Sequence, residues 1–321
     1  MKTLLFLSVI FHSLLHASDF SPSNFLYISP GFSKNLIIVE KTKLKVHVYE
    51  VDGENIKKIN SFPMAYGKTP GDKKIEGDKR TPEGIYFMKK FHNSESLIKR
   101  FGDYGKIYGA GAFTLDYPNP IDFYNKKTGN GIWLHSTDDE ARISKGLDSR
   151  GCIVVNDKNL KQIANYINVN NGTPIIVVQD LNYIDKESQK ILNKKIKSTI
   201  DTWALGWKEK DIKKYISAYH PNFKSKGKNL KWFKNYKKNV FGNTKDIILK
   251  LSNFSALQFE DYAVVTIDQY YESNLVKDKG LKTIYLKRDS FNEWKIISEK
   301  WERKKDNSSL ADGAGKIPSY F

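Results

Sequence analysis

The residues of this sequence best suited to covalent chemistry are one cysteine and a histidine that precedes it. Cys152 is the only cysteine in 321 residues, and His135 lies 17 positions before it in the segment GIWLHSTDDEARISKGLDSRGCIVV. A thiol with its free pKa of about 8.5 is a poor nucleophile until a neighbouring imidazole assists it. The pair therefore predicts catalysis by a cysteine nucleophile. The alternative is a small buried thiol and a structural histidine.

The residues beside this pair indicate two strand ends joined by a polar loop. An apolar run, Ile132–Leu134, ends at His135, and a second apolar run begins at Cys152. Gly151 leaves room for a substrate carbonyl, so the backbone N–H groups of Gly151 and Cys152 are the expected oxyanion hole. Trp133 has the same strand parity as His135 and is expected to face the same side, as a pocket wall or as core.

Three motifs in order resemble the YkuD-type L,D-transpeptidase catalytic domain. The first is the histidine followed by the box Ser149-Arg150-Gly151-Cys152, which resembles the family's [Ser/Thr]-x-Gly-Cys. The second is Thr81-Pro82-Glu83-Gly84-Ile85-Tyr86, which resembles its T-P-x-G-x-[FY] turn. The third, Leu115-Asp116-Tyr117-Pro118-Asn119, is similar to a segment of one branch of the family.

The resemblance also implies roles for the neighbours of the pair. The family usually has glycine after its histidine, where this chain has Ser136, and often arginine two places after its cysteine, where this chain has Val154. Arg150 is the expected replacement for that arginine in holding a substrate carboxylate. Substrate contacts are further expected from Ser149, Trp133 and Ser136, and the carbonyl of Ser136 is expected to orient the second nitrogen of the histidine. Such chemistry requires no metal and no organic cofactor.

The amino-terminal segment is typical of a secretory signal peptide. Lys2 precedes an apolar run, Leu4–Leu15, that is too short to span a bilayer, and cleavage is expected near Ala17 or Ser18. An uncleaved membrane anchor is the alternative. Export would place the mature chain in the periplasm, where a lone cysteine retained without a disulfide partner favours a functional role.

The charge of the chain indicates an anionic partner without identifying one. The formal net charge is +17, but the lysines are scattered, and no metal-ligand spacing or nucleic-acid-binding motif accompanies them. We therefore expect no nucleic acid as partner. Peripheral attraction to an anionic wall polymer or membrane, or simply a solvated lysine-rich surface, agrees with the composition. A homodimer is left open.

Hydrophobic patterns predict two folded units of different class. After an extension over 19–34, residues 35–180 form a strand-rich unit with a long Gly/Pro/Lys loop over 67–82, which is expected to be functional. Residues 181–197 are expected to form a linker helix. Residues 198–304 show helices at 200–207, 211–219 and 232–240 and then antiparallel strands, an α+β pattern. Residues 305–321 are expected to be a flexible tail.

The second unit resembles the cone-shaped nuclear-transport-factor-2-like fold. The resemblance is carried by Trp203-Ala204-x-x-Trp207-x-x-x-Asp211-Ile212-x-x-Tyr215 and by a late Trp294-Lys295-Ile296. His220 and Asp268 are candidate pocket residues of such a cone. A binding or spacer module without a ligand of that kind is the alternative.

The expected fold class is thus a mainly β YkuD-type L,D-transpeptidase catalytic domain followed by an α+β cone-shaped domain. This combination resembles the cell-shape-determining L,D-carboxypeptidases of helical bacteria, which implies peptidoglycan peptide stems as substrate. The implied reaction trims tetrapeptide stems to tripeptides and releases D-alanine. Two alternatives stay open: an L,D-transpeptidase that forms 3→3 cross-links, and a non-enzymatic wall-binding protein. A papain-like peptidase is disfavoured because it places its cysteine before its histidine.

Overall fold

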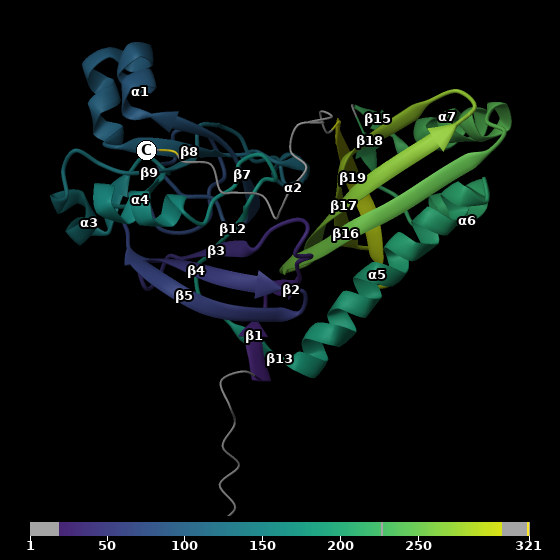
Figure 1. Ribbon diagram of the computed structural model, residues 1–321, viewed down its shortest axis with the longest axis horizontal. Coiled ribbons are helices and arrows are strands. Elements are labelled where there is room, and N and C mark those ends of the chain that lie inside the picture. Colours follow the sequence, from purple (N-terminus) through teal and green to yellow (C-terminus); the bar gives the residue numbers. More distant parts are fainter. Residues whose placement is uncertain (1–18, 226, 304–319, 321) are drawn as a thin grey trace, which may run out of the picture.

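The computed structural model describes residues 19–225, 227–303 and 320. The predicted signal peptide and all but one residue of the predicted tail lie outside these residues. The described chain folds into two domains that lie side by side along the long axis of the molecule, each built on one sheet (Figure 1).

An eight-stranded sheet forms the amino-terminal domain. Its strands are β3 (Asn35–Glu40), β4 (Lys45–Asp52), β5 (Asn55–Pro63), β7 (Gly84–Asn93), β8 (Gly111–Leu115), β9 (Trp133–His135), β11 (Ile153–Val154) and β12 (Pro174–Val178). They follow the order β11-β9-β8-β7-β12-β3-β4-β5. Residues of β3 alternate between two cores, with Ile37 and Val39 in one and Leu36 and Ile38 in the other. Both faces of the sheet are therefore covered, which explains the continuous apolar run in the sequence.

Short helices surround this sheet. They are α1 (Ser94–Phe101), the 3-10 helix η2 (Gly102–Tyr108), α2 (Pro120–Tyr124), α3 (Ala141–Lys145) and α4 (Asp157–Ala164), and a further small sheet pairs β6 (Tyr66–Gly67) with β10 (Leu147–Ser149). Helix α4 begins after Asn156, whose side chain accepts a hydrogen bond from the Asn159 N–H. Its residues Leu160 and Ile163 are fully buried in the core on one face of the sheet, together with Leu134 and Ile153.

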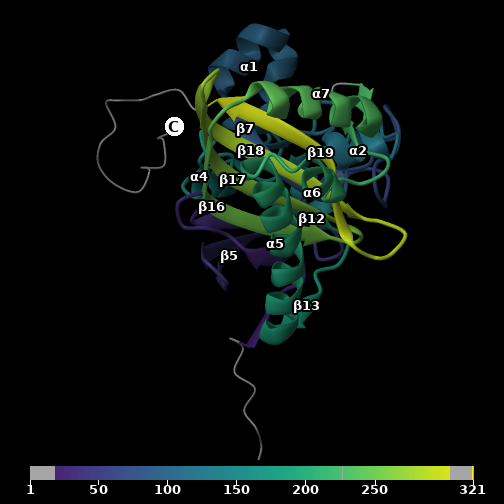
Figure 2. The same cartoon turned by 90° about the vertical axis from the view of Figure 1, so that its right-hand side faces the viewer.

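The second domain is a five-stranded antiparallel sheet covered by helices on one face (Figure 2). Its elements are α5 (Lys186–Lys208), α6 (Ile212–Ser217), β14 (Lys224–Ser225), β15 (Lys228–Asn229), α7 (Leu230–Asn243), β16 (Ile247–Phe259), β17 (Tyr262–Ser273), β18 (Lys277–Arg288) and β19 (Trp294–Arg303). The linker helix and the helix predicted at 200–207 are one continuous helix, α5, because no glycine or proline interrupts the pattern where they meet. In the described part of the chain no helix is both long and apolar enough to cross a membrane.

The amino-terminal extension joins the two domains. Its strand β1 (Phe20–Pro22) pairs with β13 (Tyr183–Asp185), and its strand β2 (Phe25–Tyr27) pairs with β16 as the fifth strand of the second sheet. A shared apolar core lies between the domains and includes Phe25, Ile38 and Val264. The sequence predicts an extension before the fold, whereas in the structure this segment is part of both domains.

One residue of the predicted tail is packed on the amino-terminal domain. The ring of Tyr320 lies 5.0 Å from those of Phe91 and Phe113, between centroids. Its hydroxyl donates to the Ile167 carbonyl at 3.1 Å and accepts from the Val169 N–H at 3.2 Å. The prediction of a flexible tail is therefore wrong at this position.

Truncating this side chain should lower stability. Tyr320→Ala is expected to reduce the free energy of unfolding by about 1–3 kcal/mol, because a ring packed against the core is lost. Tyr320→Phe keeps the ring and loses only the hydroxyl contacts, so its effect should be smaller. Urea unfolding of the two variants measures the difference, and an alanine variant as stable as the wild type would contradict the packing described.

Candidate active site

Strand pairing brings Cys152 and His135 to the same face of the sheet. Strands β9 and β11 run parallel, with Ile153 opposite Leu134 and Val154 opposite His135. Paired residues of neighbouring strands point to the same face, and residues two apart along a strand share a face. Cys152, two residues before Val154, therefore lies beside Trp133 and on the side of His135. The two residues selected from the sequence are brought together by this register.

The imidazole of His135 is held in one orientation and in its neutral form. Its Nδ1 lies 2.5 Å from the Ser136 carbonyl oxygen. Because a carbonyl only accepts, Nδ1 carries the proton and Nε2 is left as the basic nitrogen. Tyr108 packs edge-on against the ring, with 5.0 Å between centroids. Burial lowers the pKa of His135 to about 4, against the opposing effect of the Ser136 hydrogen bond.

The thiol of Cys152 is also neutral in the resting site. Its Sγ donates to the Gly131 carbonyl at 3.5 Å, and within the described chain no hydrogen bond joins Sγ to the ring of His135. Burial raises the pKa of Cys152 to about 11, although the Trp133 N–H and the positive charges of Arg142 and Lys73 favour the thiolate. The resting pair is therefore a thiol beside a neutral imidazole rather than a thiolate beside an imidazolium.

The glycine box is fixed by Ser149, which changes the expected oxyanion hole. The buried Ser149 hydroxyl donates to the Cys152 carbonyl at 2.6 Å and accepts from the Gly151 N–H at 3.0 Å. Since that N–H is already used, it is not available to an oxyanion, and the N–H of Cys152 is left as the donor from the box. The prediction that Ser149 contacts substrate is wrong in this conformation because its hydroxyl is enclosed.

Gly151 is required by its backbone and by a close neighbour. Its φ is +126°, and a Cβ at this position would lie 2.7 Å from the carbonyl oxygen of Arg80. A residue with a side chain would meet both strain and a clash. The contact also shows that the 67–82 loop packs directly on the glycine box.

The other three predicted contact residues differ in accessibility. Ser136 is fully buried, and its hydroxyl donates to the Tyr108 carbonyl at 3.0 Å, so it positions neighbours and does not reach substrate. Trp133 is half-buried between His92 and Tyr108, with centroids 5.8 and 5.0 Å away. Arg150 is exposed and forms no ion pair with any described residue. Of these three residues, Trp133 and Arg150 are therefore the two whose side chains a ligand can reach.

Arg142, in the polar loop between the pair, was missed by the sequence prediction. Its Nε donates to the Asp148 carboxylate at 2.5 Å and its Nη1 to the Thr137 hydroxyl at 3.2 Å. The charge held there lowers the pKa of both the cysteine thiol and the histidine ring. It therefore favours loss of the thiol proton and keeps the base neutral. Tyr108, whose pKa burial raises to about 12, was missed as well.

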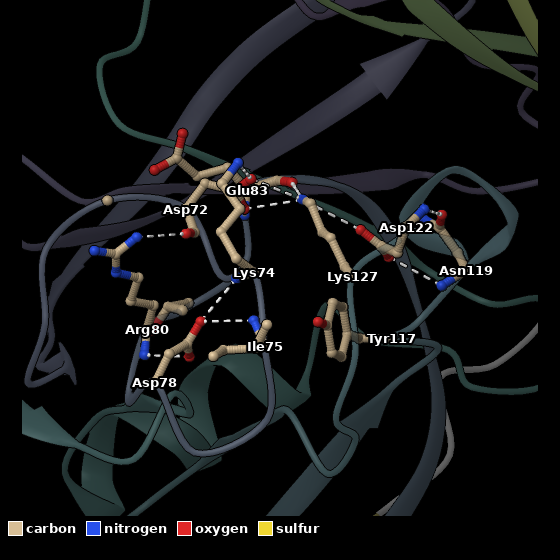
Figure 3. Close-up of polar contacts among 12 residues, drawn as sticks. Asp72, Lys74, Ile75, Asp78, Arg80, Glu83, Tyr117, Asn119, Asp122 and Lys127 are labelled. Carbon is tan, nitrogen blue, oxygen red and sulfur yellow. Dashed lines mark hydrogen bonds and ion pairs between the residues drawn. The ribbon is translucent and has the colours of Figure 1, made fainter. Parts of the chain in front are cut away.

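The 67–82 loop is held rigid by buried ionic contacts (Figure 3). The Asp78 carboxylate accepts hydrogen bonds from the N–H groups of Lys74, Ile75 and Arg80 and from the Lys73 ammonium, all between 2.7 and 3.1 Å. Burial opposes this charge, but these donors outweigh it and lower the pKa of Asp78 to about 2. The loop expected to be functional is thus a fixed wall beside the glycine box.

A second group of buried charges holds the same loop at Asp72 and, just after its end, at Glu83. The Lys127 ammonium lies 2.9 Å from Asp72 and 3.3 Å from Asp122. Near the end of the loop, the fully buried Lys41 ammonium lies 2.7 Å from the Glu83 carboxylate. Buried pairs of this kind are costly to break because the remaining partner stays desolvated.

Removing the charge of Asp78 should loosen this wall. Asp78→Asn is expected to cost about 1–3 kcal/mol of stability at pH 7, because the carboxylate accepts several charge-assisted hydrogen bonds. The wild-type contribution should be lost as the pH falls from the unfolded value, near 3.8, towards 2. Asp103→Asn, at an exposed carboxylate that pairs with Lys106, is the matched control. Equal urea midpoints for the two variants would contradict the role assigned to Asp78.

The second domain does not bring its two predicted pocket residues together. His220 is buried at a turn, where its Nδ1 accepts from the Asn222 N–H at 3.0 Å. Asp268 has the strand parity of Val264, which faces the core between the domains, and it accepts from Asn253. The prediction of a pocket formed by these residues is therefore wrong.

The interior of the cone holds a different polar group. Lys282 and Glu299 form an ion pair at 3.0 Å with side chains 9% and 10% exposed. Tyr219 donates to the same carboxylate at 3.4 Å. Lys282 and Glu299 lie on the neighbouring strands β18 and β19, and Tyr219 follows helix α6. The three residues are far apart in sequence, so no local motif indicated them.

Comparison with known families assigns both domains. Residues 34–177 match the L,D-transpeptidase catalytic domain (YkuD), and residues 195–300 match the Cds6 C-terminal NTF2-like domain. The chain belongs to the YkuD L,D-transpeptidase family and carries a C-terminal NTF2-like domain. Its catalytic domain is that of cysteine-dependent enzymes that act on peptidoglycan. None of the curated proteins compared matches the chain.

Solved structures match the chain over both domains. Bd1075 of Bdellovibrio bacteriovorus is 34% identical, with a TM-score of 0.75 over 90% of this chain and 100% of that one. The helical cell shape determining protein Pgp2 of Campylobacter jejuni is 25% identical, with a TM-score of 0.65 over 88% of this chain and 94% of that one. A point mutant of Pgp2 gives 26% identity and a TM-score of 0.67 over 87% and 94% of the respective chains.

Proposed function

We propose that this protein is an exported, periplasmic L,D-carboxypeptidase that trims peptidoglycan tetrapeptide stems to tripeptides and thereby influences cell shape. The observation that carries the proposal is the placement of Cys152 beside His135 on one face of β9 and β11. The similarity to a helical cell shape determining protein supports the choice of biological role.

The reaction would begin with proton transfer inside the pair. Nε2 of His135 takes the proton of Sγ as the sulfur attacks the carbonyl that joins the third stem residue to terminal D-alanine. The Cys152 N–H stabilises the oxyanion, an effect commonly worth about 3 kcal/mol per donor. The imidazolium then protonates the amine of D-alanine, the C–N bond breaks, and a thioester is left on Cys152.

Water would complete the cycle. The neutral imidazole of His135 takes a proton from water, which attacks the thioester carbonyl, and the returned proton restores the thiol. The tripeptide stem leaves with a new carboxylate. An amine from a second stem in place of water would give a 3→3 cross-link, so the choice between hydrolysis and transpeptidation is made at this step.

Arg150 is proposed to bind the terminal carboxylate of the stem. It stands inside the glycine box, directly before Gly151, is exposed, and has no carboxylate partner among the described residues. A guanidinium binds a carboxylate through two parallel hydrogen bonds, which would select a free chain end over an internal peptide bond.

Product analysis decides between the two outcomes. Purified protein incubated with disaccharide tetrapeptide is expected to yield disaccharide tripeptide and free D-alanine, identified by mass spectrometry. A cross-linked dimer as the main product would show an L,D-transpeptidase. If neither product forms, while the protein still sediments with peptidoglycan sacculi, the non-enzymatic wall-binding alternative would be favoured.

A further inference from the structure

The insertion between β7 and β8 adds aromatic side chains to the active-site face of the sheet. It consists of α1 and η2, and α1 stands beside β8 at the catalytic end of the molecule (Figure 1). The ring of Phe101 lies 6.3 Å from that of Trp133 and 6.0 Å from that of Tyr108, between centroids. Tyr108 in turn contacts both Trp133 and His135 at 5.0 Å. A continuous aromatic surface therefore runs from the catalytic histidine to the end of α1.

A guanidinium marks the far end of this surface. Arg100 lies in the last turn of α1, is exposed, and has its Cζ 5.0 Å from the centroid of the Phe101 ring. Among the described residues no carboxylate pairs with it, and Asp103, three positions later, pairs with Lys106 at 2.7 Å. An arginine stacked on an aromatic ring is held in place while its hydrogen-bond donors stay free for a ligand. Arg100 is therefore a candidate residue for binding an anion.

The charge of Arg100 reaches the residues around Trp133. The ring of His92 stacks on that of Trp133 with 5.8 Å between centroids. Burial lowers the pKa of His92, and the charge of Arg100 is among those that lower it further. Burial raises the pKa of Tyr108 to about 12, and the charges of Arg150 and Arg100 oppose this rise. Two guanidinium groups, one beside the thiol and one at the end of α1, therefore flank the same aromatic surface.

We infer that Arg100 binds a carboxylate at the distal end of the third stem residue's side chain, and that Trp133 and Phe101 contact the methylene groups leading to it. The inference rests on the proposed function, in which Cys152 attacks the carbonyl of that residue. A stem residue of this kind is a diaminodicarboxylic acid such as diaminopimelate. Arg100 thus determines specificity and takes no part in breaking the bond.

The spacing of the groups suits a side chain of this length. The pairing of β9 and β11 places Cys152 beside Trp133, so the third residue of the stem begins there. An extended diaminopimelate side chain spans about 6 Å from its α-carbon to the distal carboxylate carbon. The centroids of Trp133 and Phe101 are 6.3 Å apart, and the guanidinium over Phe101 is one hydrogen bond further on. Arg100 and Arg150 can therefore each hold one carboxylate of the same stem.

The charge of Arg100 predicts discrimination among stems with similar aliphatic side chains. A carboxylate accepts two parallel hydrogen bonds from a guanidinium. The same group amidated keeps its shape but offers one oxygen and no charge, so the paired contact is lost. Lysine at position three would place an ammonium beside the guanidinium, and like charges repel. Diaminopimelate should therefore be preferred to its amide, and the amide to lysine.

Release of D-alanine from three tetrapeptide stems tests the inference. The stems carry diaminopimelate, diaminopimelate amidated at its distal carboxylate, or lysine at position three. The wild type is expected to favour the first over the second about tenfold in kcat/KM, mainly through KM. Arg100→Gln should lose about tenfold on the first stem and little on the second. Arg100→Lys should recover part of the loss, because it keeps the charge without the planar fork.

A neighbouring lysine supplies the matched control. Lys99→Gln removes one exposed charge from the adjacent position of α1 and should leave the preference for the free carboxylate intact. Two results would overturn the inference: Arg100→Gln could lose equally on the acid and on the amide, or Lys99→Gln could lose as much as Arg100→Gln.

Binding to a Cys152→Ala protein separates this inference from the proposed function. Titration calorimetry with the three stems is expected to show the same preference, and Arg100→Gln in this background should remove it. If this preference appears although the wild type releases no D-alanine, the proposed function fails and the role of Arg100 stands. If D-alanine is released but neither binding nor turnover distinguishes the acid from the amide, the role of Arg100 is rejected and the proposed function stands.

Discussion

Replacing Cys152 by alanine is expected to abolish the release of D-alanine from disaccharide tetrapeptide, with a loss of about 10⁴-fold or more in kcat/KM. The sulfur is the only atom in the proposed mechanism that forms a covalent bond to substrate, and no other cysteine can replace it. Mass spectrometry of the products over time measures the loss, and it also shows whether the wild type accumulates a thioester.

The same variant separates an enzyme from a wall-binding protein. Cys152 is only half-buried, so removing its sulfur should change the melting temperature little. In cells, the enzyme hypothesis predicts that the alanine variant fails to restore tripeptide stems to a deletion strain. Full complementation by a variant without the thiol would reject catalysis as the function.

Acid should inactivate the protein through His135 at an unusually low pH. The base must be unprotonated, and burial lowers the pKa of His135 to about 4, so kcat/KM is expected to fall only as the pH drops through about 4. An ordinary histidine would cause the loss near 6.5. His135→Gln should lower kcat/KM about 10³-fold across this pH range. The fall in kcat/KM near pH 4 should also disappear in this variant, because the group that titrates there is gone.

Thiol alkylation tests the ionic state of the pair without substrate. Because the pKa of Cys152 is raised to about 11, the rate of reaction with iodoacetamide should increase about tenfold per pH unit between 7 and 10. A thiolate already paired with imidazolium would instead react at a rate independent of pH in this range. Such a flat profile would contradict the neutral pair described.

Protonation of His135 also affects stability. Its pKa is lower in the folded than in the unfolded chain, so the unfolded state binds more protons between about 4 and 6.5. Stability should therefore rise with pH across this window. Burial lowers the pKa of His47, His92 and His220 in the same direction, so they should add to the trend.

The proximity of Cys152 and His135 could be predicted because its signals are local. A single cysteine, a glycine directly before it, an apolar run that ends at His135 and another that begins at Cys152 are visible within one segment of the sequence. The structure adds what depends on partners distant in sequence or on loop geometry. Arg142 is fixed by contacts to Thr137 and Asp148, and only the folded loop directs its charge towards the pair.

The oxyanion hole shows a different limit of sequence reasoning. A glycine before a nucleophile correctly indicated a special backbone conformation, and its φ of +126° agrees. The sequence could not show that the hydroxyl of Ser149 uses the N–H of that glycine. Residue type predicted which groups are close, but not which hydrogen bonds they form with each other.

The order of helices and strands in the second domain was predicted in outline, but the prediction differs from the structure at the start of the domain and in its fifth strand. Amphipathic periodicity identified helices and strands, yet it divided α5 in two and left the strand β2 out of the fold. Short segments such as β2 have too few residues for a periodic signal. Their structure is decided by a partner strand that the local pattern does not contain.

The pairing of β2 with β16 has a consequence for how the chain can assemble. Phe25 and Leu257 are neighbours in the finished sheet, although 232 residues separate them along the chain. During synthesis the early segment must therefore wait, unpaired, until almost the whole polypeptide has emerged. The last domain cannot be produced as an independent fragment without exposing the strand edge and the apolar surface that β2 covers, which favours aggregation.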